Sequence, residues 1–214
     1  MRTLGSMLPS KQYKIAGETL YIYAPLAHRL GLFAIKTELE DLSFKYEHPD
    51  TYDNIKKQIA DSEEQRNSIF DKFATPVRAK LDAMGLKYDM KARVKSVYSI
   101  WNKMRKQNND LDGIYDLFAI RIILDSTLQK EKSDCWLAYS LITDMYQPNP
   151  SRMKDWLSIP KSNGYESLHT TVYGPDNKWV EVQIRTKRMD LVAEKGLAAH
   201  WKYKGIKSES NLDT

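Results

Sequence analysis

The chain is poor in cysteine, in glycine and proline, and in long apolar runs, and each shortage excludes a class of protein. Its 214 residues contain a single cysteine, Cys135, so it can form no internal disulfide and holds no Cys-X-X-Cys metal or redox motif. Nine glycines and eight prolines are too few for a collagen-like or low-complexity chain. No apolar run approaches the ~20 residues that span a bilayer, and no signal-peptide segment follows the start. The sequence therefore predicts a globular, cytoplasmic protein without membrane association.

Positive charge is in excess, and it is concentrated in one stretch. The chain has a formal net charge of +5 and a pI near 9.0, which indicates an anionic partner. Residues 87–106 hold seven basic residues against one acid, Asp89, and such a block suits phosphate. A solvated helix face explains a charge run equally well. The seven basic residues are Lys87, Lys91, Arg93, Lys95, Lys103, Arg105 and Lys106.

The first 85 residues follow helical periodicity. An apolar segment that contains Pro25 predicts a kinked or broken helix, because proline lacks the amide hydrogen that continues a helix. Apolar residues at helical spacing then continue until Pro49. Thr75 and Pro76 resemble the cap and first residue of a short helix that ends at Gly85. This part therefore predicts a helical segment.

From about residue 86 to residue 204, helices alternate with strands. Short apolar or alternating segments predict strands, and apolar residues at helical spacing predict helices. Residues 174–177 read Gly-Pro-Asp-Asn and predict a hairpin. The pattern is typical of a mixed α/β (α+β) domain. The predicted strands are 86–92, 117–124, 168–173 and 179–185, and the predicted helices are 94–104, 135–146 and 192–201.

The segment 179–185 alternates between aliphatic and polar residues. Side chains in a strand point to opposite faces in turn, so one face would pack and the other would be open to chemistry. The alternative is that the polar face is the solvated side of a sheet. The polar positions are Glu181, Gln183 and Arg185.

Two basic segments are candidate phosphate sites. Lys95, Ser99 and Lys103 are four residues apart and would share one helix face, with Arg93 just before the helix start. An ordinary basic surface is the alternative. In the loop 152–165, basic residues would bind phosphate and an aromatic ring beside a glycine would stack on a base, although tyrosines are common in loops. The loop residues are Arg152, Lys154, Lys161 and Tyr165.

Several segments, in order and at matching spacing, resemble the synthetase domain of the RelA/SpoT family over roughly residues 86–204. Two earlier segments, YAPLAHRLG (23–31) and ELEDLSF (38–44), resemble the junction between that family's hydrolase and synthetase domains. The synthetase-like segments are KARVKSVYSIWNKM (91–104), IYDLFAIR (114–121), NGYESLHTTVYGP (163–175), EVQIRT (181–186) and AEKGLAAHWKYK (193–204).

The resemblance implies a nucleotidyltransferase-like mixed sheet flanked by helices and preceded by a helical segment. It also implies transfer of the β,γ-pyrophosphate of ATP to the 3′-hydroxyl of GDP or GTP, which gives ppGpp or pppGpp and AMP, with Mg²⁺ as cofactor. Such chemistry requires positioning and charge neutralisation more than a covalent nucleophile. The implied substrates are ATP and GDP or GTP. The ribosome and regulatory domains are implied partners of a full-length protein, and nucleic-acid binding is not expected of this chain.

The resemblance also assigns roles to individual residues. Asp116 and Glu181 would hold Mg²⁺, and Glu181 would accept the proton of the 3′-hydroxyl. Asp116 lies five residues before Arg121, and a regular strand would put the two on opposite faces. We therefore expect Asp116 to precede the regular strand, or a bulge to lie between the two residues. Arg93 and Arg121 would sandwich adenine. The remaining ATP ligands would be Lys95, Ser99, Lys103, Lys154 and Lys161, and the acceptor ligands would be Tyr165, Asn163, His169 and Gln183.

The resemblance implies a fragment of a longer protein. Residues 1–48 would be a helical remnant of the hydrolase domain and the junction, 49–85 connecting helices, 86–204 the synthetase domain and 205–214 a tail. The family's hydrolase needs a His-Asp motif, and none of the four histidines here precedes an aspartate, so hydrolysis is not expected. The basic segment 152–155 resembles that of bifunctional members and implies that GDP is used at least as well as GTP.

Two other functions compete with synthesis. Basic helices with Tyr and Trp also suit an RNA-binding module, but Asp116 and Glu181 in a phosphate-backbone groove would repel RNA. A catalytically silent nucleotide-binding domain is the other alternative. The positions implied by the resemblance carry the expected residue types, so silence would come from conformation.

Overall fold

We describe a computed structural model of the chain over residues 1–107 and 118–196. This part of the chain forms two compact units. The first contains Met1–Pro49, Pro160–Glu166 and the chain from Arg188 onward, and the second contains Asp50–Ile159 and Ser167–Lys187. Within the described residues, no helix combines the length and the apolar character needed to cross a membrane.

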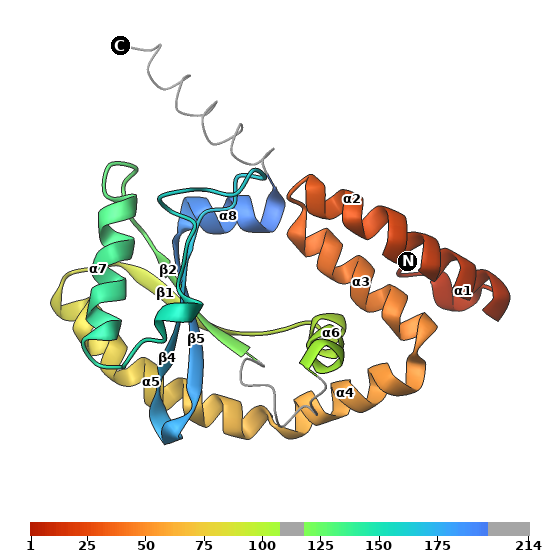
Figure 1. Cartoon of the computed structure of the whole chain (residues 1–214), viewed down its shortest axis with the longest axis horizontal. Helices are drawn as coiled ribbons and strands as arrows, with labels where there is room; N and C mark the ends of the chain where they lie inside the picture. Colours follow the sequence, from red (N-terminus) through yellow and green to blue (C-terminus); the bar gives the residue numbers. More distant parts are fainter. Residues whose placement is uncertain (108–117, 197–214) are drawn as a thin grey trace, which may run out of the picture. The chain divides into compact units, whose positions relative to one another are not determined.

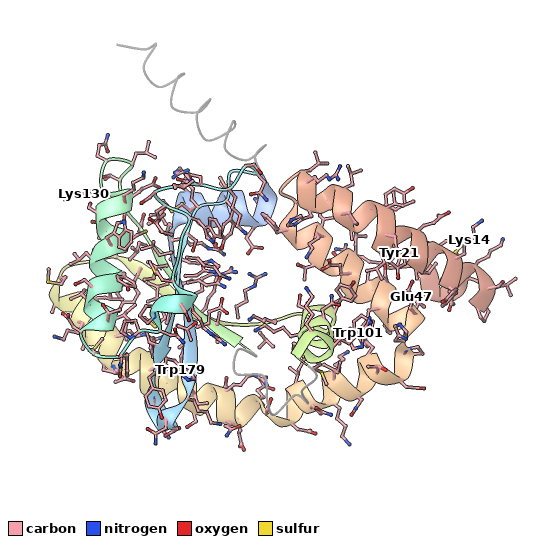
Figure 2. The ribbon with its side chains drawn as sticks, in the orientation of Figure 1. Lys14, Tyr21, Glu47, Trp101, Lys130 and Trp179 are labelled. Carbon is pink, nitrogen blue, oxygen red and sulfur yellow. The ribbon has the colours of Figure 1, made fainter. Side chains whose placement is uncertain are left out.

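The first unit is built on a helical N-terminal segment. Its long helices pack on one another, with α3 against both α1 and α2 (Figure 1). The predicted break near Pro25 is confirmed as a π-helical stretch, η2, that joins α1 to α2. The helical elements of this segment are η1 (Leu4–Ser6), α1 (Pro9–Glu18), η2 (Thr19–Tyr23), α2 (Ala24–Arg29) and α3 (Phe33–Glu47).

The second unit is built on a five-stranded mixed sheet in the order β1-β2-β5-β4-β3. β2 and β5 run parallel, and the other neighbouring pairs are antiparallel. This confirms the mixed α/β class, and the predicted hairpin joins β4 to β5 through residues 174–178. The strands are β1 (Tyr88–Val94), β2 (Phe118–Leu124), β3 (Lys154–Asp155), β4 (Leu168–Tyr173) and β5 (Trp179–Thr186).

Helices cover one face of this sheet. α7 packs against β2, β4 and β5, and α5 packs on α7 (Figure 1). The hydroxyl of Thr186 donates to Glu131 Oε1 of α7 at 2.7 Å, so the even-numbered side chains of β5 point toward this layer. Val180, Val182 and Ile184 lie on the same face and are buried. The remaining elements are α4 (Pro49–Asp61), α5 (Glu63–Ala83), α6 (Val97–Gln107), α7 (Glu131–Thr143), η4 (Pro150–Arg152), η5 (Pro175–Asn177) and α8 (Lys187–Lys195).

The predicted helix start at Thr75 is wrong, because α5 continues through Pro76. An internal proline costs a helix about 3 kcal/mol or more. Four large side chains at a spacing of four residues are buried on this helix, and each contributes roughly 1.5–3 kcal/mol. Packing therefore outweighs the cost of the proline. These side chains are Ile69, Phe73, Val77 and Leu81.

The boundary between β1 and α6 also differs from the prediction. β1 pairs with β2 as far as Val94, which is opposite Phe118, and α6 begins at Val97. Ser96 Oγ accepts a hydrogen bond from the backbone N–H of Ser99 at 3.3 Å, as a helix N-cap residue does. Lys95 therefore lies in a turn and not on the helix.

Candidate active site

The face of the sheet opposite α7 carries polar side chains in two neighbouring rows. Residues paired across strands point to the same side, so each row follows from the strand register. The second of these rows contains the carboxylate predicted to be catalytic. The first row is Lys91, Arg121, Gln183, His169 and Lys154, and the second is Arg93, Ala119, Glu181 and Thr171. The structure thus places Arg93, Arg121, Lys154, His169, Glu181 and Gln183 on one face.

Several polar side chains on this face meet at Glu181. Lys95 Nζ donates to Glu181 Oε2 at 3.1 Å, and Gln183 Nε2 donates to Oε1 at 2.9 Å. His169 Nδ1 lies 3.9 Å from the same Oε1. The side chains of Lys95 and Glu181 are 23% and 16% exposed, so water screens their attraction only in part. Three predicted site residues therefore surround the predicted base.

The surroundings of Glu181 set its ionisation. Burial, the strongest single influence, acts to raise the pKa of this carboxyl. The positive charge of Lys95, the Gln183 amide and His169 act in the opposite direction and together outweigh burial, so the pKa of Glu181 lies below its usual value. The carboxylate is consequently charged at neutral pH.

The predicted adenine pair lies on adjacent strands. Arg121 on β2 is opposite Gln183 on β5, and it is 3% exposed. On its other side Arg121 is opposite Lys91 of β1, and Arg93 lies two residues after Lys91 and is exposed. Gln183 is also buried, and its Oε1 has no hydrogen-bond partner among the described residues. Arg121 and Gln183 thus form a buried polar edge beside Glu181.

Two further predicted phosphate ligands lie on α6. Ser99 and Lys103 are one turn apart, and both are half-buried. Ser96, which the sequence analysis did not single out, orders the start of this helix, because its hydroxyl bonds both the amide and the hydroxyl of Ser99. The Ser-X-X-Ser spacing at the end of a strand is the signal that could have identified this cap.

The basic segment near residue 152 forms the edge of the sheet. Arg152 ends the short η4 helix, and Lys154 begins β3, where it is exposed and opposite His169. β3 was predicted as loop, because two residues are too few to show a periodic pattern. Asp155 Oδ1 accepts hydrogen bonds from the backbone amides of Leu157 and Ser158, which fixes the turn that follows.

Lys161, Asn163 and Tyr165 belong to the first unit, within Pro160–Glu166. Lys161 Nζ lies 5.5 Å from the centre of the Tyr165 ring, and Asn163 Oδ1 accepts from the Tyr165 amide at 3.3 Å. Phe33 at the start of α3 meets the Tyr165 ring edge to face at 5.8 Å. Phe33 was not predicted as part of the site, since a contact between residues so far apart in the chain has no local pattern.

The predicted magnesium ligands fit the ion in part. Asp116 lies outside the described residues, and among those described no group of three or more His, Cys, Asp and Glu side chains is arranged to hold a metal. Mg²⁺ takes carboxylate oxygens as ligands. Each oxygen of Glu181 accepts one hydrogen bond from Lys95 or Gln183 and retains a second lone-pair position. Glu181 therefore suits one ligand position.

Comparisons with known proteins show the family of the chain. The family model described as a region found in RelA / SpoT proteins matches residues 92–208. The chain is 46% identical over 213 residues to a GTP pyrophosphokinase of Myxococcus xanthus, covering all of this chain and 28% of that protein. It is 43% identical over 204 residues to the bifunctional (p)ppGpp synthase/hydrolase SpoT of Escherichia coli K12, covering 95% of this chain and 28% of that protein.

A solved structure also overlaps with the chain in part. It is the small alarmone synthetase 1 of Bacillus subtilis bound to its product pppGpp, with 21% identity and a TM-score of 0.49. The overlap covers 70% of this chain and 83% of that chain. The two curated relatives are much longer than this chain, which spans about 28% of their length.

Proposed function

The chain belongs to the RelA/SpoT family, and from this premise we propose that it is a (p)ppGpp synthetase module. It transfers the β,γ-pyrophosphate of ATP to the 3′-hydroxyl of GDP or GTP. The 3′-oxygen forms a bond to the β-phosphorus, and the bond from that phosphorus to the oxygen bridging the α-phosphate breaks. AMP leaves, and the hydroxyl proton passes to a base.

The observation that carries the proposal is the setting of Glu181. Its carboxylate is charged, lies on a polar sheet face and is surrounded by Lys95, Gln183 and His169. A general base must be ionised and within hydrogen-bond reach of the proton it takes. Glu181 accepts the proton of the 3′-hydroxyl in this proposal.

Polar and basic side chains of the second unit bind the donor phosphates in this proposal. Lys95 is adjacent to the base, Ser99 and Lys103 follow on α6, and Lys154 lies at the edge of the same sheet. The negative charge of the ATP phosphates must be neutralised during transfer. Ammonium groups that are already in place do this with little rearrangement of the site. These residues, with Lys161 from the loop, bind the ATP phosphates, and Arg93 and Arg121 hold the adenine.

The acceptor is bound by residues of the loop and of the sheet. Tyr165 stacks on guanine, and Asn163, whose Oδ1 accepts a hydrogen bond from the Tyr165 amide, contacts the same nucleotide. His169 and Gln183 hold the acceptor nucleotide, and the buried Gln183 Oε1 is an acceptor for a nucleotide donor group. Mg²⁺, held by Glu181 and Asp116, would neutralise charge on the transferred phosphates.

We propose synthesis without hydrolysis for this chain. The E. coli relative is named as both a synthase and a hydrolase, but no histidine here is followed by aspartate. We propose no contact with the ribosome for this chain, which spans 28% of the length of its Myxococcus xanthus relative.

The test is a product assay with a matched pair of variants. The chain is incubated with ATP labelled at the γ-phosphate, Mg²⁺ and GDP or GTP, and the products are separated. We expect labelled alarmone and AMP from the wild type and a loss of roughly 10²–10⁴-fold for Glu181→Gln, with nucleotide binding kept within a few fold. Glu64→Gln, an exposed change on α5, is the control and should keep wild-type turnover.

Two results would contradict this assignment. If Glu181→Gln kept half of the wild-type turnover, Glu181 would not be the base. If the wild type made neither alarmone nor AMP, synthesis would be wrong, and a nucleotide-binding or RNA-binding module would remain. Retention of labelled RNA by the wild type would then separate those two.

A further inference from the structure

The loop Pro160–Glu166 packs on the N-terminal helices within the first unit. The ring of Tyr165 meets Phe33 edge to face, with centres 5.8 Å apart and planes at 74°. Phe33 in turn meets His28 at 5.6 Å and 75°. The three rings run from α2 through the start of α3 to the loop. Phe33 is thus held on one side by α2 and holds Tyr165 on the other.

A second, independent contact joins the same corner to the same loop. Gly31, in the turn between α2 and α3, has a φ of +72°, and a Cβ added there would lie 3.2 Å from the Asn163 carbonyl oxygen. Gly196 at the end of α8 approaches this turn as closely, since its Cβ would lie 3.0 Å from Leu32 Cδ2 and 3.3 Å from the Gly31 carbonyl oxygen. The α2–α3 corner therefore touches the loop through backbone as well as through an aromatic ring.

The loop is closed on itself, so these contacts set its orientation as a whole. The Gly164 amide donates to the Lys161 carbonyl at 2.8 Å, and the Lys161 amide donates to the Tyr165 carbonyl at 3.1 Å. With both ends of the turn bonded, the Tyr165 ring cannot reorient freely while Phe33 and Gly31 hold the loop. The neighbours of the ring include Phe33, in an edge-to-face pair, and Lys161, whose Nζ lies 5.5 Å from the ring centre.

We propose that Phe33 and Gly31 are positioning residues for the acceptor nucleotide. This inference rests on the proposed function, in which Tyr165 stacks on the guanine base. Neither residue touches a nucleotide in this account. They hold the Tyr165 ring in the orientation that stacking needs. Nucleotide binding then loses less conformational entropy, because the loop and the ring are already ordered.

It follows that the N-terminal helices control acceptor affinity. A partner or a preceding domain that shifted α2 against α3 would move Phe33 and Gly31 and so change the affinity for GDP or GTP. The affinity for ATP would change less, because the predicted ATP ligands other than Lys161 belong to the second unit.

The kinetic test removes the ring of Phe33 and then restores it. Phe33→Leu should raise KM for GDP or GTP by roughly two- to tenfold, the amount that an edge-to-face pair contributes, with KM for ATP within twofold of the wild type. Phe33→Tyr keeps the ring and should restore KM. Ile35→Ala, an exposed change on the same helix, is the matched control and should change neither KM. If Phe33→Leu leaves the acceptor KM unchanged, or raises both KM values equally, the proposal is wrong.

A double-mutant cycle asks whether Phe33 acts through Tyr165. If it does, adding Phe33→Leu to Tyr165→Ala should cause little further loss of acceptor affinity. Independent, multiplicative losses would instead give Phe33 a general structural role and overturn the proposal. Phe33→Met, which also removes the ring but has an unbranched side chain that adapts to irregular space, takes the place of Phe33→Leu if that variant fails to fold.

A structural measurement separates this inference from the proposed function. Lys161 is exposed, so the rate of tryptic cleavage after it reports how firmly the loop is held. Phe33→Leu should increase this rate by roughly two- to tenfold, whereas Ile35→Ala should not. An unchanged cleavage rate contradicts the anchoring by Phe33. If the wild type makes no alarmone but Phe33→Leu still increases the cleavage rate, the synthetase assignment is contradicted and the anchoring of the loop by Phe33 is supported.

Discussion

Removing the ammonium of Lys95 should destabilise the protein at neutral pH and should do so less in acid. Lys95→Met keeps the length of the side chain but leaves the Glu181 carboxylate without its nearest positive charge, 3.1 Å away. Burial then acts on Glu181 with less opposition, so its pKa rises above the wild-type value. The charged carboxylate becomes a cost to the folded state.

The magnitude follows from the distance and the exposure of the pair. At an effective dielectric constant of about 20, two charges 3.1 Å apart attract by about 5 kcal/mol, which is an upper limit of about 4 pKa units. Opposite charges at such distances shift carboxyl pKa values by roughly 1–3 units in proteins. Because one unit equals about 1.4 kcal/mol, Lys95→Met should lose roughly 1.4–4 kcal/mol near pH 7.

The pH dependence has a defined sign. In the wild type, the lowered pKa of Glu181 stabilises the fold above the pKa of the unfolded chain, and this contribution is lost as the pH falls through the folded value. In Lys95→Met, protonation of Glu181 removes an uncompensated charge. The difference in unfolding free energy between the two proteins should therefore be largest near pH 7 and smaller in acid, because it shrinks as the pH falls through the pKa of Glu181 in Lys95→Met toward the lower pKa in the wild type.

Urea unfolding in the presence of a chelator measures this directly, because no metal then competes for Glu181. Lys72→Met is the matched control, since Lys72 pairs with Asp176 at 2.8 Å but the two side chains are 52% and 45% exposed. Such a surface pair contributes about 0–1 kcal/mol. If Lys95→Met lost no more than this control, or lost the same amount at both pH values, Lys95 would not set the ionisation of Glu181.

Three other variants test separate parts of the molecule. Tyr165→Ala should weaken guanosine nucleotide binding by roughly 1–3 kcal/mol and ATP binding much less, as measured by calorimetry, and equal losses would make Tyr165 structural. Arg152→Glu combined with Lys154→Asp should raise the Mg²⁺ concentration needed for half-maximal synthesis and abolish any preference for GDP, whereas an unchanged Mg²⁺ profile would refute a role for this segment. Thr186→Val removes the 2.7 Å hydrogen bond to the buried carboxylate of Glu131 and should lower the unfolding free energy by about 1–3 kcal/mol, so a neutral result in urea titration would contradict the importance of that bond.

The strands and the turn of the hairpin were predicted well, because their sequence signals are local. The strands 168–173 and 179–185 were predicted within one residue of β4 and β5, because alternation and the Gly-Pro-Asp-Asn turn are both encoded nearby. The parallel pairing of β2 with β5 and the two-residue β3 were not predicted. Strand order depends on contacts between distant segments, and no periodicity records it.

The candidate site shows the same division. Alternation along β5 placed Glu181 and Gln183 on one face, and the structure confirms this. Which groups meet Glu181 was a different question, since Lys95 lies 86 residues earlier in the chain. Likewise, the sequence suggested Tyr165 as an aromatic in a loop, but its neighbour Phe33 lies in a helix at the other end of the chain. The sequence predicted the candidate site residues but not the residues that contact them.

The position of Lys95 shows how a small error in a boundary changes the chemistry. On a helix face it would stand four residues before Ser99 and eight before Lys103, and the two ammonium groups would extend one basic stripe. Pairing of β1 with β2 through Val94 keeps the strand going, and the Ser96 cap starts the helix only at Val97, so Lys95 falls in the turn between them. From that turn its ammonium group reaches the carboxylate of Glu181. The residue predicted as a phosphate ligand is therefore also the group that keeps the predicted base ionised, and a nucleotide phosphate that binds Lys95 must compete with Glu181 for it.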